Sequence, residues 1–194
     1  DYYRNDRGGD RNCCTVGGKT PTGFHAHFIL IDDPLDPQGA RIGSEIQVTS
    51  SGQRETSPIL KSNGTEFGLV WSDTRHGTGR EIYFRRLSAT GQPIGSEVRI
   101  TNEPADSAWA DLAWNPVARE WALVWHDLRD GNSEIYLQRL DSGGGFLGPA
   151  VRLTSSAGTS AYPSIDWNGF QYGVSWHDDR AGVFKRMSES DWYD

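Results

Sequence analysis

The sequence predicts an all-β fold and, within that class, a β-propeller of four-stranded antiparallel blades. Three observations predict it: the chain repeats itself about every fifty residues, each repeat holds short strand-like runs, and turn-forming and aromatic residues are abundant, with 23 Gly, 8 Trp, 7 Tyr and 7 Phe. Aromatic side chains suit a pleated surface, and Gly permits tight turns. Four strands in about 40–55 residues is the size of one propeller blade. A β-sandwich and a β-solenoid are the alternatives, but sandwiches rarely repeat in sequence and solenoid coils are usually shorter.

Three copies of the repeat follow one another, at residues 42–87, 94–140 and 147–187. The first run of each copy ends at a Thr, and Thr49, Thr101 and Thr154 are separated by 52 and 53 residues. The third run carries an aromatic residue four positions before a Trp, in the pairs Phe67/Trp71, Trp121/Trp125 and Tyr172/Trp176. Apolar residues alternate within the runs, and no helix-length window shows helical periodicity.

The N-terminal residues 1–35 contain a degenerate copy, in which Tyr3–Gly9 aligns with the turn after Trp176. These residues and the short tail after Met187 supply the strands of about one further blade. We therefore expect one domain in which residues 36–194 form three intact blades and a short tail. Residues 1–35 and this tail form a composite fourth blade that closes the ring, which would leave no open sheet edge. The alternative is a fragment of a larger propeller. The adjacent Cys13 and Cys14 are expected to be reduced and packed, because a vicinal disulfide is strained.

A charged turn follows the third run in every copy. Its most repeated residues are an Asp and an Arg two positions later: Asp73 and Arg75, Asp127 and Arg129, Asp178 and Arg180. A single active site rarely needs three equivalent copies, whereas every blade needs its turn. We therefore expect Asp to accept hydrogen bonds from turn N–H groups and Arg to bridge to a neighbouring strand.

The segment Trp125–Tyr136, WHDLRDGNSEIY, resembles the repeat of bacterial TolB-type propellers, which are relatives of the WD40 class. The resemblance covers residues 42–187 in three copies and implies a propeller fold. It is confined to one turn and its flanking strands, because the Trp-Ser-Pro-Asp-Gly turn of that family appears here only as Trp114-Asn-Pro-Val and Trp167-Asn-Gly-Phe. Propellers include binding proteins, scaffolds and hydrolases, so the fold does not give the function.

Charge and hydropathy limit the partners. The net charge is −7 and the pI is about 5.2, which argues against nucleic acid, because a phosphate backbone requires a basic surface. No apolar run is long enough to span a membrane. The composition favours an exported protein, extracellular or periplasmic, and a first residue other than Met is compatible with a removed secretion signal. Membership of a larger complex is left open.

One turn resembles a short calcium loop. Asp127, Asp130, Asn132 and Glu134 place oxygen atoms at alternating positions around Gly131. The other two copies lack this pattern. A structural calcium ion is therefore the one cofactor that the sequence leaves open.

The sequence contains no recognisable catalytic site. His126 and His177 directly follow the repeated Trp, so we expect them to be strand residues, and no nucleophile elbow accompanies them. His25 and His27 are too few ligands for a zinc site. A glycosidase needs two carboxylates on one cleft, and the adjacent acids in the sequence do not establish such a pair.

Three aromatic residues fall outside the core pattern: Trp109, Tyr162 and Trp192. Trp109 and Tyr162 occupy equivalent positions, which we expect in loops on one rim, where they could bind a sugar; packing between blades is the alternative. The leading hypothesis is a non-catalytic binding or scaffolding propeller for a glycan or a protein. The alternatives are a carbohydrate-active hydrolase of the sialidase-like type and an accessory subunit of a larger assembly.

Overall fold

The structure, a computed structural model, describes residues 27–28, 31–32, 41–42, 45–49, 51–77, 79–179 and 185–186. Within these ranges every regular element is a β-strand, and every strand pair is antiparallel. The predicted all-β class and the antiparallel pairing are therefore confirmed. None of these residues belongs to a helix with the length and apolarity that a bilayer crossing requires.

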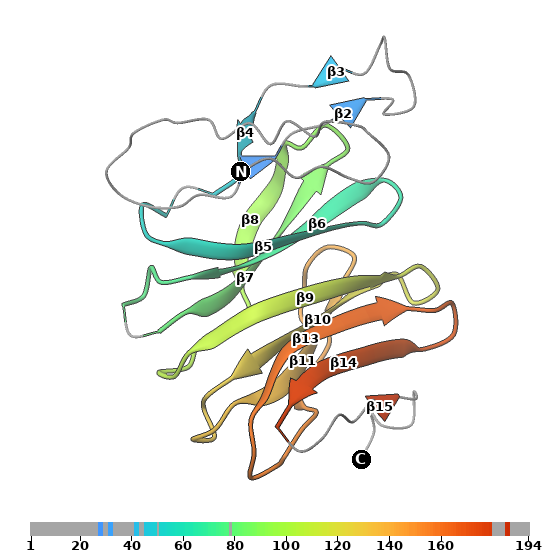
Figure 1. Cartoon of the computed structure of the whole chain (residues 1–194). Coiled ribbons are helices and arrows are strands. Elements are labelled where there is room, and N and C mark those ends of the chain that lie inside the picture. Colours follow the sequence, from blue (N-terminus) through green and yellow to red (C-terminus); the bar gives the residue numbers. More distant parts are fainter. Residues whose placement is uncertain are drawn as a thin grey trace, which may run out of the picture.

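Three sheets make up most of the described chain (Figure 1). The first sheet consists of β5 (Glu55–Ser62), β6 (Glu66–Asp73), β7 (Glu81–Ser88) and β8 (Pro93–Arg99). The second sheet consists of β9 (Ser107–Asn115), β10 (Glu120–Asp127), β11 (Glu134–Asp141) and β12 (Val151–Arg152). The third sheet consists of β13 (Ser160–Trp167), β14 (Tyr172–Asp178) and β15 (Lys185–Arg186). In each sheet the strands are ordered as they are in the chain.

Two short strand pairs precede the first sheet. β1 (His27–Phe28) pairs with β4 (Ile46–Gln47), and β2 (Ile31–Asp32) pairs with β3 (Arg41–Ile42). The described residues between His27 and Asp32 therefore belong to two different strand pairs. Cys13, Cys14 and most of the degenerate copy lie outside the described residues.

The sheets are offset by one strand from the sequence copies. The run that opens the second copy forms β8 and pairs with β7 of the first sheet, and the run that opens the third copy forms β12 and pairs with β11. A sequence repeat gives the spacing between the copies but does not say at which strand of the copy each sheet begins, which we call the phase of the repeat. The phase is set by hydrogen bonding: Thr101 at the end of the β8 run donates its hydroxyl to Glu81 of β7, and Thr154 does the same to Glu134 of β11.

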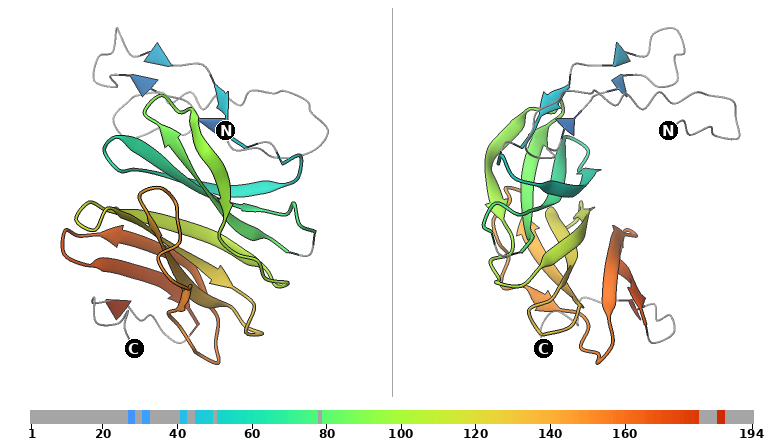
Figure 2. Two further views of the ribbon diagram at one scale, coloured as in Figure 1. Left: turned by 180° about the vertical axis from the view of Figure 1, so that it is seen from behind. Right: turned by 60° about the vertical axis from the view of Figure 1, so that its left-hand side comes forward.

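The second sheet buries both of its faces. One face packs against Val70, Ile82 and Phe84 of the first sheet, and the other packs against Ile165, Tyr172 and Val174 of the third. β10 is consequently buried along its whole length. The sheets thus follow one another in chain order as a curved stack (Figure 2), in which no sheet could bury its apolar faces alone.

The repeated tryptophans have equivalent surroundings. Trp71 and Trp125 are completely buried, and each contributes to the core on the side of its sheet that faces the preceding strands. Trp176 packs in the same way against the core shared with the second sheet. The indole N–H of each donates to the Asp two positions later, with N···O distances of 3.5, 2.9 and 3.1 Å in chain order. The sequence repeat is therefore a repeat of packing as well.

Gly68 allows a close contact between the first two sheets. A Cβ atom built at this position would lie 2.9 Å from Trp121 and 3.0 Å from Leu112 and Phe84. We expect Gly68→Ala to lower the free energy of unfolding by about 1–3 kcal/mol, the usual penalty for overpacking a core. Gly173, the same position in the third sheet, has no described atom within 4 Å of such a Cβ, so Gly173→Ala is the matched control. Urea unfolding of both variants checks this, and equal losses would contradict it.

Candidate functional site

The first strand of each of the three large sheets contains the same β-bulge. In β5, β9 and β13 two residues lie opposite the single repeated Trp of the neighbouring strand, where the pairing register shifts. The first of the two is Ser57, Trp109 or Tyr162, and its φ is 55°, 54° or 52°. We call these three the bulge residues. β-branched and bulky side chains rarely adopt this left-handed conformation, and a bulge re-aims the side chain it carries.

The bulges bring aromatic rings of two sheets together. β9 lies beside β13, and the rings of Trp109 and Tyr162 meet edge to face with their centroids 5.2 Å apart. The imidazoles of His126 and His177 lie 5.8 and 6.4 Å from the ring of Tyr162. Trp109 nevertheless remains 41% exposed and Tyr162 56% exposed, so both rings present a free surface. We call the pair the aromatic platform.

Two adjoining cavities lie at the platform. The larger, of about 690 Å³, runs from β5 across β9 to β13 and is lined by Ile59, Lys61, Asp111 and both platform rings among others. The smaller, of about 520 Å³, lies between the first two sheets and is lined by Arg80, Asp106 and Thr56 among others. Ser57 and Trp109 line both cavities, so the two adjoin at these residues, and we call them together the groove. These volumes are in the range of ordinary ligand sites.

A carboxylate joins the second and third sheets in the floor of the larger cavity. Asp111 accepts hydrogen bonds from the hydroxyl of Ser164 at 2.8 Å and from the backbone N–H of Ile165 at 3.0 Å. These contacts hold β13 against β9 next to the platform. Asp111 therefore positions Tyr162 relative to Trp109.

An ion pair forms one wall of the smaller cavity. Arg80 Nε donates to both carboxylate oxygens of Asp106 at 3.0 and 2.9 Å, and the Arg80 backbone N–H donates to the same carboxylate at 2.7 Å. Burial raises the pKa of Asp106, but hydrogen bonds from Arg80 and its charge outweigh burial, and the net pKa lies below the usual value. Asp106 is therefore ionised at neutral pH.

His126 is an uncharged group behind the platform. Its side chain is buried, Nδ1 has no hydrogen-bond partner among the described residues, and burial followed by the nearby charge of Arg80 lowers its pKa. It is thus a neutral imidazole at pH 7, which suits packing against Tyr162.

The repeated Asp and Arg residues form buried turn networks. Asp127 accepts from the Trp125 indole, the Ser107 hydroxyl, and the backbone N–H, Nε and Nη2 of Arg129, at 2.6–3.0 Å. The guanidinium of Arg129 also stacks over Tyr136, 4.4 Å from the ring centroid. Burial raises the pKa of Asp127, and the hydrogen bonds from Arg129, Trp125 and Ser107 lower it further than burial raises it. These contacts are those of a structural turn.

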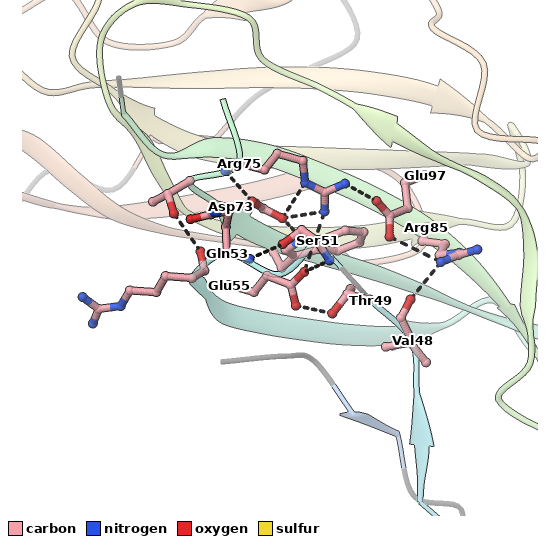
Figure 3. Close-up of polar contacts among 12 residues, drawn as sticks. Val48, Thr49, Ser51, Gln53, Glu55, Asp73, Arg75, Arg85 and Glu97 are labelled. Atoms are coloured by element: carbon pink, nitrogen blue, oxygen red, sulfur yellow. Dashed lines mark hydrogen bonds and ion pairs between the residues drawn. The ribbon is translucent and has the colours of Figure 1, made fainter. Parts of the chain in front are cut away.

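The first sheet repeats this network with one substitution (Figure 3). Asp73 accepts from the backbone N–H and Nε of Arg75 at 2.7 and 2.8 Å, and Arg75 also reaches Glu97. Glu55 stands where the second and third sheets have Ser107 and Ser160, which donate to their Asp. A carboxylate cannot donate in this way; instead Arg75 Nη2 lies 3.7 Å from Glu55, and Thr49 donates its hydroxyl to it.

In the third sheet Asp178 receives hydrogen bonds from the Ser160 hydroxyl and the Trp176 indole at 3.2 and 3.1 Å. Arg180 lies outside the described residues, as do Trp192 and His25. The platform thus contains two of the three aromatic residues expected to bind a ligand.

The turn expected to resemble a calcium loop is filled by its own contacts. Asp127 is engaged by Arg129, and Asp130 accepts from the Tyr136 hydroxyl at 2.5 Å. Glu134 pairs with Arg152 at 2.9 Å, and Asn132 donates its side-chain N–H to Glu134 and to two backbone carbonyls. No group of three or more His, Cys, Asp or Glu among the residues described could hold a metal ion.

The expected place of Trp109 and Tyr162 was wrong. They do not lie in rim loops before a strand; they lie inside β9 and β13. The reason is the bulge, which interrupts the alternation of inward and outward residues. The sequence pattern of such a strand therefore resembles that of a loop. The contributions of His126, His177, Asp111 and the Arg80–Asp106 pair were missed, because contacts between sheets have no local sequence pattern. The shared alignment of the bulge residues in the three copies was the available signal.

No protein-family model and no curated protein sequence matches the chain. Among solved structures, the chain is similar to an endo-arabinase from Bacteroides thetaiotaomicron VPI-5482, with a TM-score of 0.51 and 18% sequence identity. The similarity covers 82% of this chain and 63% of the endo-arabinase chain. This likeness concerns the fold. The resemblance to TolB-type repeats stays a prediction.

Proposed function

We propose that this chain is part of a carbohydrate-binding β-propeller that holds its ligand on the aromatic platform. Two features support a propeller: the antiparallel sheets pack one on the next, and the first strand of each lies beside the first strand of the sheet before it. The number of blades and closure at four stay predictions. So do a protein partner, membership of a larger assembly and an extracellular or periplasmic location.

The observation that carries the proposal is the exposed platform held by strained backbone. Two large aromatic rings at positive φ remain about half exposed, although rings of this size are normally buried. Non-Gly residues in such conformations cluster at ligand sites, where the surrounding structure maintains the strain. The face of an aromatic ring suits the apolar face of a sugar, and the nearby Asp111, Ser164 and Lys61 supply hydrogen-bonding groups.

The similarity to an endo-arabinase supports carbohydrate as the ligand class. Arabino-oligosaccharides are therefore the first probe. We expect arabinotriose to bind the full chain with a dissociation constant in the micromolar to millimolar range, a typical range for a shallow site with few buried anchors. Isothermal titration calorimetry, with quenching of Trp fluorescence as a second signal, checks this. No heat and no quenching with arabinose, arabinobiose or arabinotriose would contradict the proposal for this sugar class.

Hydrolysis of a polysaccharide is the second candidate, and the same similarity favours it. A glycosidase needs a carboxylic acid that is protonated at the working pH, together with a second carboxylate. Among the described residues, the carboxylates that line the two cavities are Asp106, whose pKa is lowered, and Asp111, which is bound to Ser164 and Ile165. Binding without turnover is thus favoured. Release of reducing sugar from arabinan, abolished in Asp106→Asn or Asp111→Asn, would establish hydrolysis instead.

A further inference from the structure

The smaller cavity has features that the platform does not need. It adjoins the larger one at Trp109, so a ligand unit resting on the platform has a neighbouring space of about 520 Å³ on the side of the first sheet. Most of the residues that line this space are polar, whereas the platform is aromatic. Its wall contains a cation and an anion side by side, Arg80 and Asp106, whose side chains are 32% and 26% exposed.

The Arg80–Asp106 pair is built rigidly into the fold. The Arg80 backbone N–H donates to Asp106, the backbone N–H of Ser107 donates to the Arg80 carbonyl at 2.8 Å, and that of Leu128 donates to the Asp106 carbonyl at 3.1 Å. Gly79 permits this approach, because a Cβ there would lie 3.2 Å from the carbonyl oxygen of Ala105. Fixed donors and acceptors bind a ligand with little ordering cost.

Thr56 lines the same cavity and carries an unpaired hydroxyl. Its Oγ1 is buried and has no hydrogen-bond partner among the described residues, although buried hydroxyls are nearly always bonded. A guanidinium edge and a carboxylate offer donors and acceptors next to each other, and rotation of the Thr56 side chain about its Cα–Cβ bond would add its hydroxyl to them. Neighbouring hydroxyl groups on a sugar ring both donate and accept, so they match this set.

We propose that the smaller cavity is a second sugar subsite, in which Arg80, Asp106 and Thr56 bind vicinal hydroxyls of the unit next to the one on the platform. This inference rests on the proposed carbohydrate binding and deepens it. The ligand is then an oligosaccharide of at least two units, and affinity rises with chain length until both cavities are filled. Two or three added hydrogen bonds are expected to raise the affinity at least about tenfold from arabinose to arabinotriose.

Three variants of the full chain test the subsite by calorimetry with arabinose and arabinotriose. Arg80→Lys keeps the charge but loses the planar fork, and Asp106→Asn keeps an acceptor for the Arg80 backbone N–H. Both are expected to reduce arabinotriose affinity about tenfold and arabinose affinity less than about twofold. Thr56→Val removes only the hydroxyl, so it should weaken arabinotriose binding by about threefold or more without lowering the melting temperature.

The matched control is Arg86→Lys. Arg86 forms a similar two-pronged pair with Glu66 at 2.9 Å, but at the other end of β7. It should change neither affinity. Equal binding of arabinose and arabinotriose, or unchanged chain-length dependence in all three subsite variants, would overturn the subsite while leaving the platform intact. Failure of every sugar to bind would overturn both proposals.

Discussion

Asp127→Asn is expected to lower the free energy of unfolding by about 3–5 kcal/mol, the usual loss when one partner of a buried ion pair is removed. Asp127 is completely buried and accepts hydrogen bonds from Trp125, Ser107 and Arg129. An amide places two N–H donors among these donors and leaves the Arg129 charge without its partner. Urea or thermal unfolding followed by Trp fluorescence measures the loss.

The matched control is Asp166→Asn. Asp166 is exposed, and within the described part of the chain it accepts only from the N–H of its neighbour Trp167, so its replacement should change the stability by less than about 0.5 kcal/mol. Equal effects of the two substitutions would mean that the repeated Asp does not stabilise the turn. That result would reopen its interpretation as a ligand-binding charge.

The stabilisation from Asp127 also has a defined pH dependence. Its pKa is lower in the folded protein than the ordinary Asp value of about 3.9 in the unfolded chain. The stabilisation is therefore complete above about pH 5 and is lost as the pH falls through the folded pKa. We expect the stability difference between wild type and Asp127→Asn to be constant from neutral pH to about pH 5 and to shrink below about pH 4. A difference that grows on acidification would contradict the ionised state.

Tyr162→Gly and Trp109→Gly are expected to weaken arabinotriose binding about 10–100-fold, as removal of an aromatic anchor does at a binding hot spot. The stability should respond very differently. Glycine adopts positive φ freely, so each substitution relieves about 1–2 kcal/mol of backbone strain. This offsets part of what is lost with the half-buried ring, namely its apolar burial and an aromatic contact worth about 0.5–1.5 kcal/mol. Calorimetry and urea unfolding on the same samples separate the two effects.

Comparison with alanine sharpens this test. Tyr162→Ala removes the same ring but keeps the strain, so it should be less stable than Tyr162→Gly by about 1 kcal/mol and bind equally weakly. Phe170→Ala is the binding control, since Phe170 is 88% exposed but lines neither cavity at the platform. Loss of several kcal/mol of stability in Tyr162→Gly, with unchanged sugar affinity, would show that the platform serves packing between the sheets.

Much of the fold could be predicted because its causes are local. Alternation within the runs around Leu123 and Ile135 specified strands, and Gly and Asn specified the turns between them. The Asp–Arg turn could be predicted for the same reason: Asp127 bonds to the N–H and side chain of a residue only two positions away. The assignment of each run to a sheet could not be read in this way. It depends on Thr101 reaching Glu81, and a periodic sequence is equally compatible with either phase.

By itself, the sequence determined the strand class, the period of about fifty residues and the equivalence of Trp109 with Tyr162. Only the tertiary structure decided that these two rings meet, that Trp109 lines both cavities, and that Arg80 lies against Asp106. The physical reason is the range of the forces involved. Strand alternation and turn bonding act between residues close in the chain, whereas the groove arises where bulged strands of neighbouring sheets pack together, about fifty residues apart, and that packing depends on all their faces at once.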